Sequence, residues 1–83
     1  MVVYKVYTKT NYADTWRDPD DIHIVDLCHK SNLDDALKVA NDYIQERFFH
    51  KDTILRENLI GNYSATDFRS YGATIYVDKI IVD

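Results

Sequence analysis

The sequence predicts an α+β domain in which one long amphipathic helix covers one face of a three- or four-stranded, mainly antiparallel sheet. Three observations lead to this prediction. Residues 2–9 alternate in polarity, residues 33–48 repeat apolar side chains every three or four positions, and residues 73–82 form another strongly apolar segment. The element order is therefore β-β-α-(α or β)-β. A chain of 83 residues is expected to form a single domain, residues 1–83.

Residues 2–9 predict the first strand, with one face apolar and the other wet. One face carries Val2, Tyr4, Val6 and Thr8, and the other carries Val3, Lys5, Tyr7 and Lys9. Because lysine favours water, the second set marks the solvent-exposed face. Residues 10–21 contain turn-forming residues, and long connections of this kind are often functional. Residues 22–29 predict a second strand, and their poor alternation indicates that both faces are partly covered.

A helix is predicted to begin after Ser31 or Asn32, either of which can cap it. Asp34 and Asp35 then occupy the first turn, where the helix dipole favours negative charge. Its buried stripe consists of Leu33, Ala36, Leu37, Ala40, Tyr43, Ile44 and Phe48. We expect the helix to end near Phe49 or His50.

Residues 53–60 are ambiguous between a short helix and a third strand. Leu55 and Leu59 are four positions apart, and Gly61 can cap a helix, so the helical turn is favoured slightly. A polar and aromatic loop is expected from Asn62 to Tyr71.

Residues 73–82 predict the last strand. Ile75 and Val77 share one face, whereas Ile80 and Val82 lie on the other. This change of phase indicates a bulge near residues 78–79, or burial on both sides. The first and last strands are the most apolar, so we expect them in the interior of the sheet.

The charge is distributed unevenly along the chain. The net charge is −4, yet residues 11–35 hold seven aspartates and only two basic residues, a net charge of −5. No cluster of lysine or arginine is present, which disfavours direct binding to nucleic acid. An acidic lobe suits a basic protein partner, for example one that handles nucleic acid. The alternative is that acidic loops only maintain solubility.

The sequence has few features that indicate a cellular compartment. Cys28 is the single cysteine, so no intramolecular disulfide can form, and its apolar surroundings suggest a small core residue. No apolar run follows Met1, so no signal peptide is expected, and no stretch has the length of a membrane span. These features predict a protein of the cytoplasm.

The residues that could support catalysis or metal binding do not form a recognisable motif. His23, Cys28, His29 and His50 match no zinc spacing, and the aspartates between residues 14 and 21 lack the spacing and central glycine of a calcium loop. No nucleophile elbow and no phosphate-binding glycine loop are present. We therefore expect no enzyme activity, no metal and no cofactor.

Two connections are the better candidates for a binding site, because they combine aromatic residues with arginine. These residue types are enriched in interface hot spots. The candidate partner-binding residues are Tyr12, Asp14, Trp16, Arg17, Asp18, Asp20 and Asp21 in the first connection, and Tyr63, Phe68, Arg69 and Tyr71 in the second. The alternative is that rings such as Trp16 and Phe68 fold back onto the small core.

The organisation of the chain resembles that of small accessory proteins of bacteriophages and prophages. The resemblance rests on the short leading strand, the acidic connection, the helix Leu33-Asp-Asp-Ala-Leu-Lys-Val-Ala40 and the closing Ile75-Tyr-Val-Asp-Lys-Ile-Ile-Val82. It spans most of the chain and carries over no functional residue. It implies host-takeover proteins, inhibitors of defence systems such as anti-CRISPR proteins, or small regulators. Many of these proteins occupy a partner's surface, and acidic ones sometimes imitate nucleic acid.

The sequence thus favours a non-catalytic protein-binding module that occupies a surface of a host or defence protein. The first alternative is a self-assembling or homodimeric protein that pairs through an edge strand, or through a helix flank bearing Val39 and Phe49. The second alternative is a small metal-binding protein or enzyme.

Overall fold

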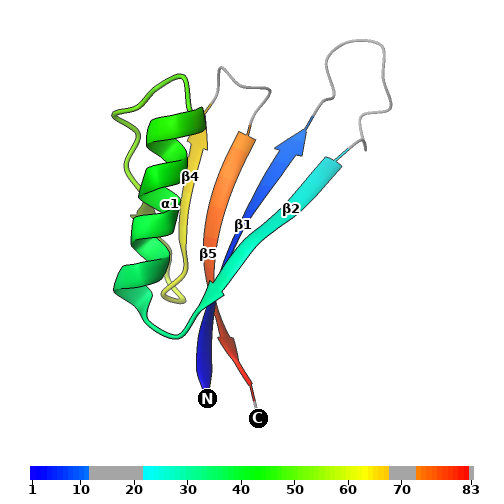
Figure 1. Ribbon diagram of the computed structural model, residues 1–83, viewed down its shortest axis with the longest axis vertical. Coiled ribbons are helices and arrows are strands. Elements are labelled where there is room, and N and C mark those ends of the chain that lie inside the picture. Colours follow the sequence, from blue (N-terminus) through cyan, green and yellow to red (C-terminus); the bar gives the residue numbers. More distant parts are fainter. Residues whose placement is uncertain (12–21, 68–72, 83) are drawn as a thin grey trace.

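The protein combines one antiparallel sheet with one helix in the described parts of the chain, residues 1–11, 22–67 and 73–82 of the computed structural model (Figure 1). The elements are β1 (Val2–Asn11), β2 (Ile22–Lys30), α1 (Leu33–Arg47), β3 (Arg56–Glu57), β4 (Tyr63–Asp67) and β5 (Ala73–Ile81). The strand order is β2-β1-β5-β4-β3. The α+β class, the antiparallel sheet and the interior position of the first and last predicted strands are confirmed, but the sheet has five strands rather than three or four.

The two central strands pair without interruption, from Val2 opposite Ile81 to Lys9 opposite Thr74. The bulge expected near residues 78–79 is therefore absent from this ladder. The irregularity lies instead between β1 and β2, where the register shifts at Leu27. A bulge bends the strand that carries it and strengthens its twist. In Figure 1, β2 accordingly follows β1 away from the helix at one end of the sheet.

Helix α1 begins where the sequence predicts and ends slightly earlier. The side chain of Asn32 caps it, with Oδ1 accepting a 2.8 Å hydrogen bond from the backbone amide of Asp34. The helix ends at Arg47, and Phe48 is already extended. The next amide, that of Phe49, donates to Oδ2 of the buried Asp67 at 2.5 Å. The amide of Phe49 therefore bonds a side chain on β4, and the helix does not extend to Phe49 or His50 as expected.

The core lies between α1 and the central strands. The predicted helix stripe is confirmed, because Ala36, Ala40 and Ile44 are fully buried and Phe48 is nearly so. The sheet contributes Val6 from β1 and Ala65, Ile75 and Val77 from β4 and β5. Each large side chain buried here stabilises the fold by roughly 1.5–3 kcal/mol.

The second half of the chain differs from expectation in two places. Residues 53–60 contain no helix, and Arg56–Glu57 form the short outer strand β3. Residues 63–67, expected in a loop, form β4. The two strands are joined by a tight turn in which Gly61 has φ +83°, a conformation that glycine adopts without strain. Pairing with β5 explains β4, whose small and polar residues give only a weak strand signal.

Strand β2 is more exposed than expected. Ile24, Val25 and Leu27 expose 60%, 54% and 37% of their surface, and Cys28 is half-buried at the margin of the core. The reason is positional, since β2 is an outer strand and α1 contacts β1 and β5 more than it contacts β2. Both faces of this strand are therefore partly covered, as predicted, although Ile24 and Val25 are each covered by less than half.

Candidate functional site

Most of the predicted binding residues lie outside the described part of the chain. This holds for every candidate between residues 12 and 21, and for Phe68, Arg69 and Tyr71. Tyr63 is described, and it lies in β4 rather than in a loop. Its ring is half-buried beside the core, and desolvation together with the neighbouring Glu57 carboxylate raises the pKa of its phenol. The structure therefore locates only this one of the predicted residues.

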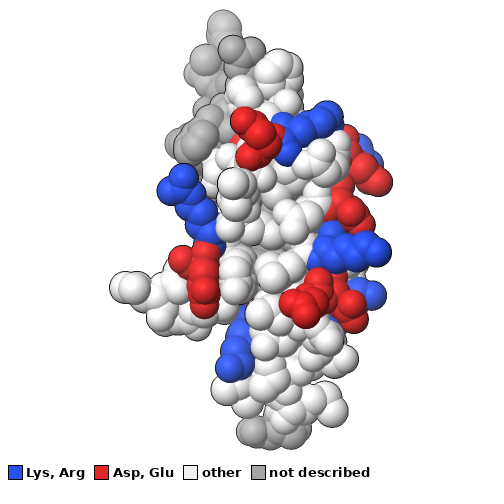
Figure 2. All heavy atoms as spheres, turned by 90° about the vertical axis from the view of Figure 1, so that its left-hand side faces the viewer, with Lys and Arg blue, Asp and Glu red and all other residues white. Residues whose placement is uncertain are grey.

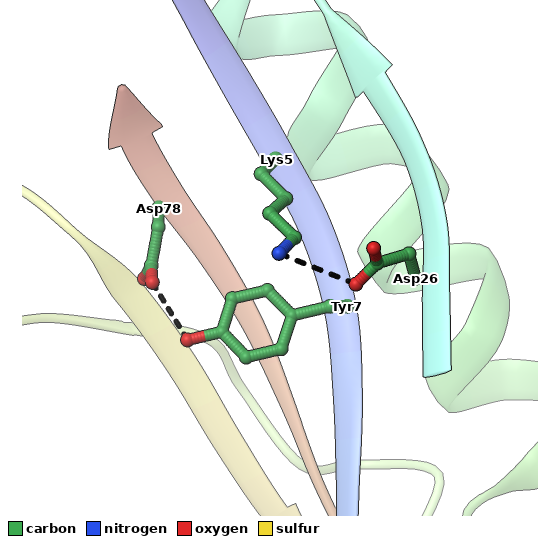
Figure 3. Close-up of polar contacts among 4 residues, drawn as sticks. All are labelled: Lys5, Tyr7, Asp26 and Asp78. Carbon is green, nitrogen blue, oxygen red and sulfur yellow. Dashed lines mark hydrogen bonds and ion pairs between the residues drawn. The ribbon is translucent and has the colours of Figure 1, made fainter. Parts of the chain in front are cut away.

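A different set of side chains meets on the face of the sheet that α1 leaves uncovered, here called the open face. Alternation along the strands places Lys5 and Tyr7 of β1, Asp26 of β2, and Tyr76 and Asp78 of β5 on this face. Figure 3 shows four of them meeting across three strands, with the helix behind the sheet. Four of the five lie on the interior strands β1 and β5, and Asp26 reaches them from the neighbouring outer strand β2.

Two tyrosines form the centre of the open face. Tyr7 lies directly opposite Tyr76, and their rings stack with centroids 4.9 Å apart and planes 14° apart. The hydroxyl group of Tyr7 donates a 2.6 Å hydrogen bond to Oδ2 of Asp78 (Figure 3). The ring of Tyr7 is therefore fixed at both its face and its tip.

Lysine and aspartate complete the arrangement around Tyr7. Lys5 Nζ lies 3.3 Å from Oδ1 of Asp26 and 5.0 Å from the centroid of the Tyr7 ring. The ion pair is partly exposed, so it adds at most about 1 kcal/mol, and the cation–π contact adds a similar amount. The principal effect is orientation, because Asp26, Lys5, Tyr7 and Asp78 form one continuous row of contacts.

The environment of Tyr7 keeps its phenol protonated. Burial, the hydrogen bond to Asp78 and the negative charge of that carboxylate all raise the pKa of Tyr7 far above its ordinary value. A phenol with a raised pKa is a poor base and a poor nucleophile at neutral pH. The arrangement is thus suited to holding a ring and a hydroxyl group in place rather than to proton transfer.

A hollow of about 560 Å³ lies beside β4, near the edge of the sheet that is formed by β3 and β4. It is lined by His50, Asp52, Thr53, Ile54, Arg56, Ser64, Ala65 and Thr66. Its size falls in the range of small-molecule sites. The lining combines one arginine with one aspartate and three hydroxyl groups, so its charge selects no class of ligand.

Charges on the face that bears α1 are mixed. Figure 2 shows acidic and basic side chains interspersed there rather than gathered by sign. Of the seven aspartates in residues 11–35, Asp26, Asp34 and Asp35 belong to the described chain, and Asp26 is paired with Lys5. The four that give the predicted acidic lobe its density lie outside the described residues.

The described residues contain no candidate metal site and no candidate membrane span. No three histidine, cysteine or acidic side chains gather there in a way that could hold a metal ion. None of the helical segments placed by the structure is long and apolar enough to cross a membrane. Comparison with known protein families, with curated proteins and with solved structures finds no match.

The residues of the open face were not among the predicted site residues, although part of the signal was visible. Alternation in residues 2–9 places Tyr7 on the wet face beside two lysines. The same reasoning in the last strand places Tyr76 and Asp78 on one face and the apolar Ile75 and Val77 on the other. Only the register of β1 against β5 shows that these side chains meet.

Proposed function

We propose that this protein is a non-catalytic protein-binding module that presents the open face to its partner. The observation that carries the proposal is the stacked pair of Tyr7 and Tyr76 on the sheet face that the described elements leave uncovered. Tyrosine is enriched at protein interfaces because it combines a large apolar ring with a polar tip. Charged groups around the pair resemble the polar rim that surrounds an interface hot spot.

Preorganisation supports the same conclusion. Immobilising a flexible side chain at an interface costs about 0.5–1.5 kcal/mol. Tyr7 is already held by the stack, by Asp78 and by the lysine above its ring. A partner that packs on this ring therefore loses little further conformational entropy there, so more of the contact energy remains as affinity.

The proposed partner is a basic protein that handles nucleic acid, in a host cell or a defence system, and the protein acts by occupying its surface. Support for this class comes from the acidic excess of residues 11–35 and from the resemblance to phage accessory proteins, including the anti-CRISPR type. Acidic residues outside the described chain then steer the encounter, while the open face supplies the contact.

Retention of proteins from a bacterial lysate on immobilised protein tests the proposal. The decisive variant is Tyr76→Ala, which removes one ring of the stack and keeps the Tyr7–Asp78 bond. Its matched control is Phe49→Ala, which removes an equally large ring that is 63% exposed and lies after α1. We expect Tyr76→Ala to lower retention of a defined partner at least tenfold and Phe49→Ala to leave it unchanged, with circular dichroism verifying both folds.

A second arm tests the role of charge. The triple variant Asp18/Asp20/Asp21→Asn is expected to slow association and to flatten its salt dependence. If no specific partner is retained, or if retention is indifferent to Tyr76→Ala, the open face is not the binding surface. If salt has no effect on wild-type binding, the acidic mechanism is wrong even when the partner is real.

A further inference from the structure

The two edges of the sheet differ in their capacity to accept another strand. At one edge, β3 has only two residues, and a short edge strand is a common protection against unwanted pairing. At the other edge, β2 has nine residues, and no other described strand pairs on its outer side. A long outer strand presents a row of backbone donors and acceptors to any strand that approaches it.

The N-terminal half of β2 carries apolar side chains on both faces of the sheet. Ile24 pairs with Lys9, which places it on the open face, and Val25 pairs with the buried Thr8 on the helix side. Both are more than half exposed. In recognition by strand addition, main-chain hydrogen bonds give affinity and the side chains on the two faces give specificity. A strand added here would make those hydrogen bonds and also shield apolar surface on both faces.

The bulge limits where a new strand can pair. Regular alternation against β1 extends from Ile22 to Asp26, and the register shifts at Leu27. Beyond the bulge, the strand bends and carries Lys30 at its end, and both features discourage pairing. The available segment is therefore residues 22–26, with Ile24 at its midpoint.

We infer that this edge is a homodimer interface, in which β2 of one copy pairs antiparallel with β2 of a second copy about a twofold axis at Ile24. The inference is independent of the proposed binding function. The strand carries one aspartate and one lysine, and the aspartate is paired with Lys5, so the edge is neutral within an acidic protein. A neutral strand attracts neither a basic nor an acidic peptide, and it suits an apolar, neutral strand such as β2 itself.

The proposed register satisfies the charge pattern. With the axis at Ile24, the two Ile24 side chains meet across the interface on the open face. Asp26 of one copy lies opposite position 22 of the other, so the two Asp26 carboxylates are ~13 Å apart along the strands. That distance exceeds the Debye length of ~10 Å at 0.1 M salt. An axis at Asp26 would instead place the two carboxylates directly opposite each other.

Such a dimer would be isologous and closed, with a continuous ten-stranded sheet and both helices on one side. The same symmetry places both open faces on the other side, so each dimer presents two tyrosine pairs in one surface. Closure also removes the one long free edge among the described strands.

Sedimentation equilibrium of the wild-type chain at increasing concentration tests the inference, with Ile24→Lys as the decisive variant. This substitution places two like charges on the axis, and Ile54→Lys is the matched control, since Ile54 is 76% exposed and lies in the connection before β3. We expect a wild-type dimer, at least a tenfold weaker association for Ile24→Lys, and no change for Ile54→Lys. Added salt should strengthen the dimer, because it screens repulsion between two chains of charge −4.

Cysteine cross-linking tests the register separately. Residues directly opposite in an antiparallel pair have Cα atoms about 4.5–5.5 Å apart, which suits a disulfide. Ile24→Cys is therefore expected to form a covalent dimer under mild oxidation, whereas the wild type, with only Cys28, is not. A wild type that stays monomeric at millimolar concentration, a dimer indifferent to Ile24→Lys, or cross-linking through Cys28 alone would overturn the inference.

Discussion

Replacing Tyr7 by phenylalanine removes one oxygen atom from the centre of the open face and leaves the stacked ring in place. The hydroxyl group donates a 2.6 Å bond to Asp78, and a hydrogen bond to a charged acceptor contributes about 1.5–3 kcal/mol to stability. Both side chains are half-buried, so water replaces part of this bond in the variant. We therefore expect Tyr7→Phe to lower the free energy of unfolding by about 1 kcal/mol.

The assay is urea unfolding at neutral pH, followed by circular dichroism. In urea, this loss should lower the midpoint concentration and leave the m value unchanged. In thermal unfolding, a loss of about 1 kcal/mol corresponds to a decrease in Tm of about 4–8 °C for a domain of this size. Tyr76→Phe is the matched control, because Tyr76 makes the same stack and its hydroxyl group has no hydrogen-bond partner identified among the described residues. Its expected cost is below about 0.5 kcal/mol.

A double-mutant cycle isolates the contact itself. Tyr7→Phe, Asp78→Ala and the combined variant should give a coupling energy of about 1 kcal/mol, because neither group retains its partner once the other is gone. The reasoning is refuted if Tyr7→Phe costs no more than Tyr76→Phe, or if the two substitutions prove additive.

Three further predictions concern the helix, the core and the response to pH. Ile44→Ala should cost about 3 kcal/mol in urea unfolding, because Ile44 is fully buried, whereas Phe49→Ala should cost under about 0.5 kcal/mol; equal costs would contradict the assigned core. Asn32→Ala should cost about 1 kcal/mol and reduce helical signal, since it removes the cap on the Asp34 amide, and a neutral result would place the cap elsewhere. Because the pKa of Tyr7 is raised on folding, its contribution to stability is complete below the ordinary tyrosine pKa of ~10 and declines as the pH rises above it. Unfolding measured from pH ~8 to ~11 should show this decline, less steeply in Tyr7→Phe, and identical profiles would argue against the raised pKa.

The parts of the fold that the sequence predicts well are those in which one pattern dominates. The alternation of β1 and the stripe of α1 each follow a single period, and burial of Val6, Ala40 and Ile44 agrees with both. The strand β4 was missed because Ser64 and Thr66 give it little apolar character. Its conformation depends on pairing with β5, which is a tertiary effect that local propensity does not encode.

The candidate site shows the same division. Lys5 and Lys9 alone identify the solvent-exposed face of β1, and alternation places Tyr7 on the same face. The contact between Tyr7 and Asp78 requires the register of two strands that are far apart in the sequence, and no turn between them fixes that register. The bulge at Leu27 is similarly invisible in the sequence, although it determines which part of β2 can pair further.

The central position of β1 and β5 has a kinetic consequence. These two strands lie near opposite ends of the described chain, and the contact between Tyr7 and Asp78 joins side chains 71 positions apart. Each doubling of a loop adds about 0.6 kcal/mol to the entropic cost of closing it, and domains dominated by such non-local pairings fold slowly. On a ribosome, β1 emerges long before its central neighbour exists, so the early chain has only β2 and the helix to shelter its apolar side. Sheet completion should therefore be the late, rate-limiting event of folding.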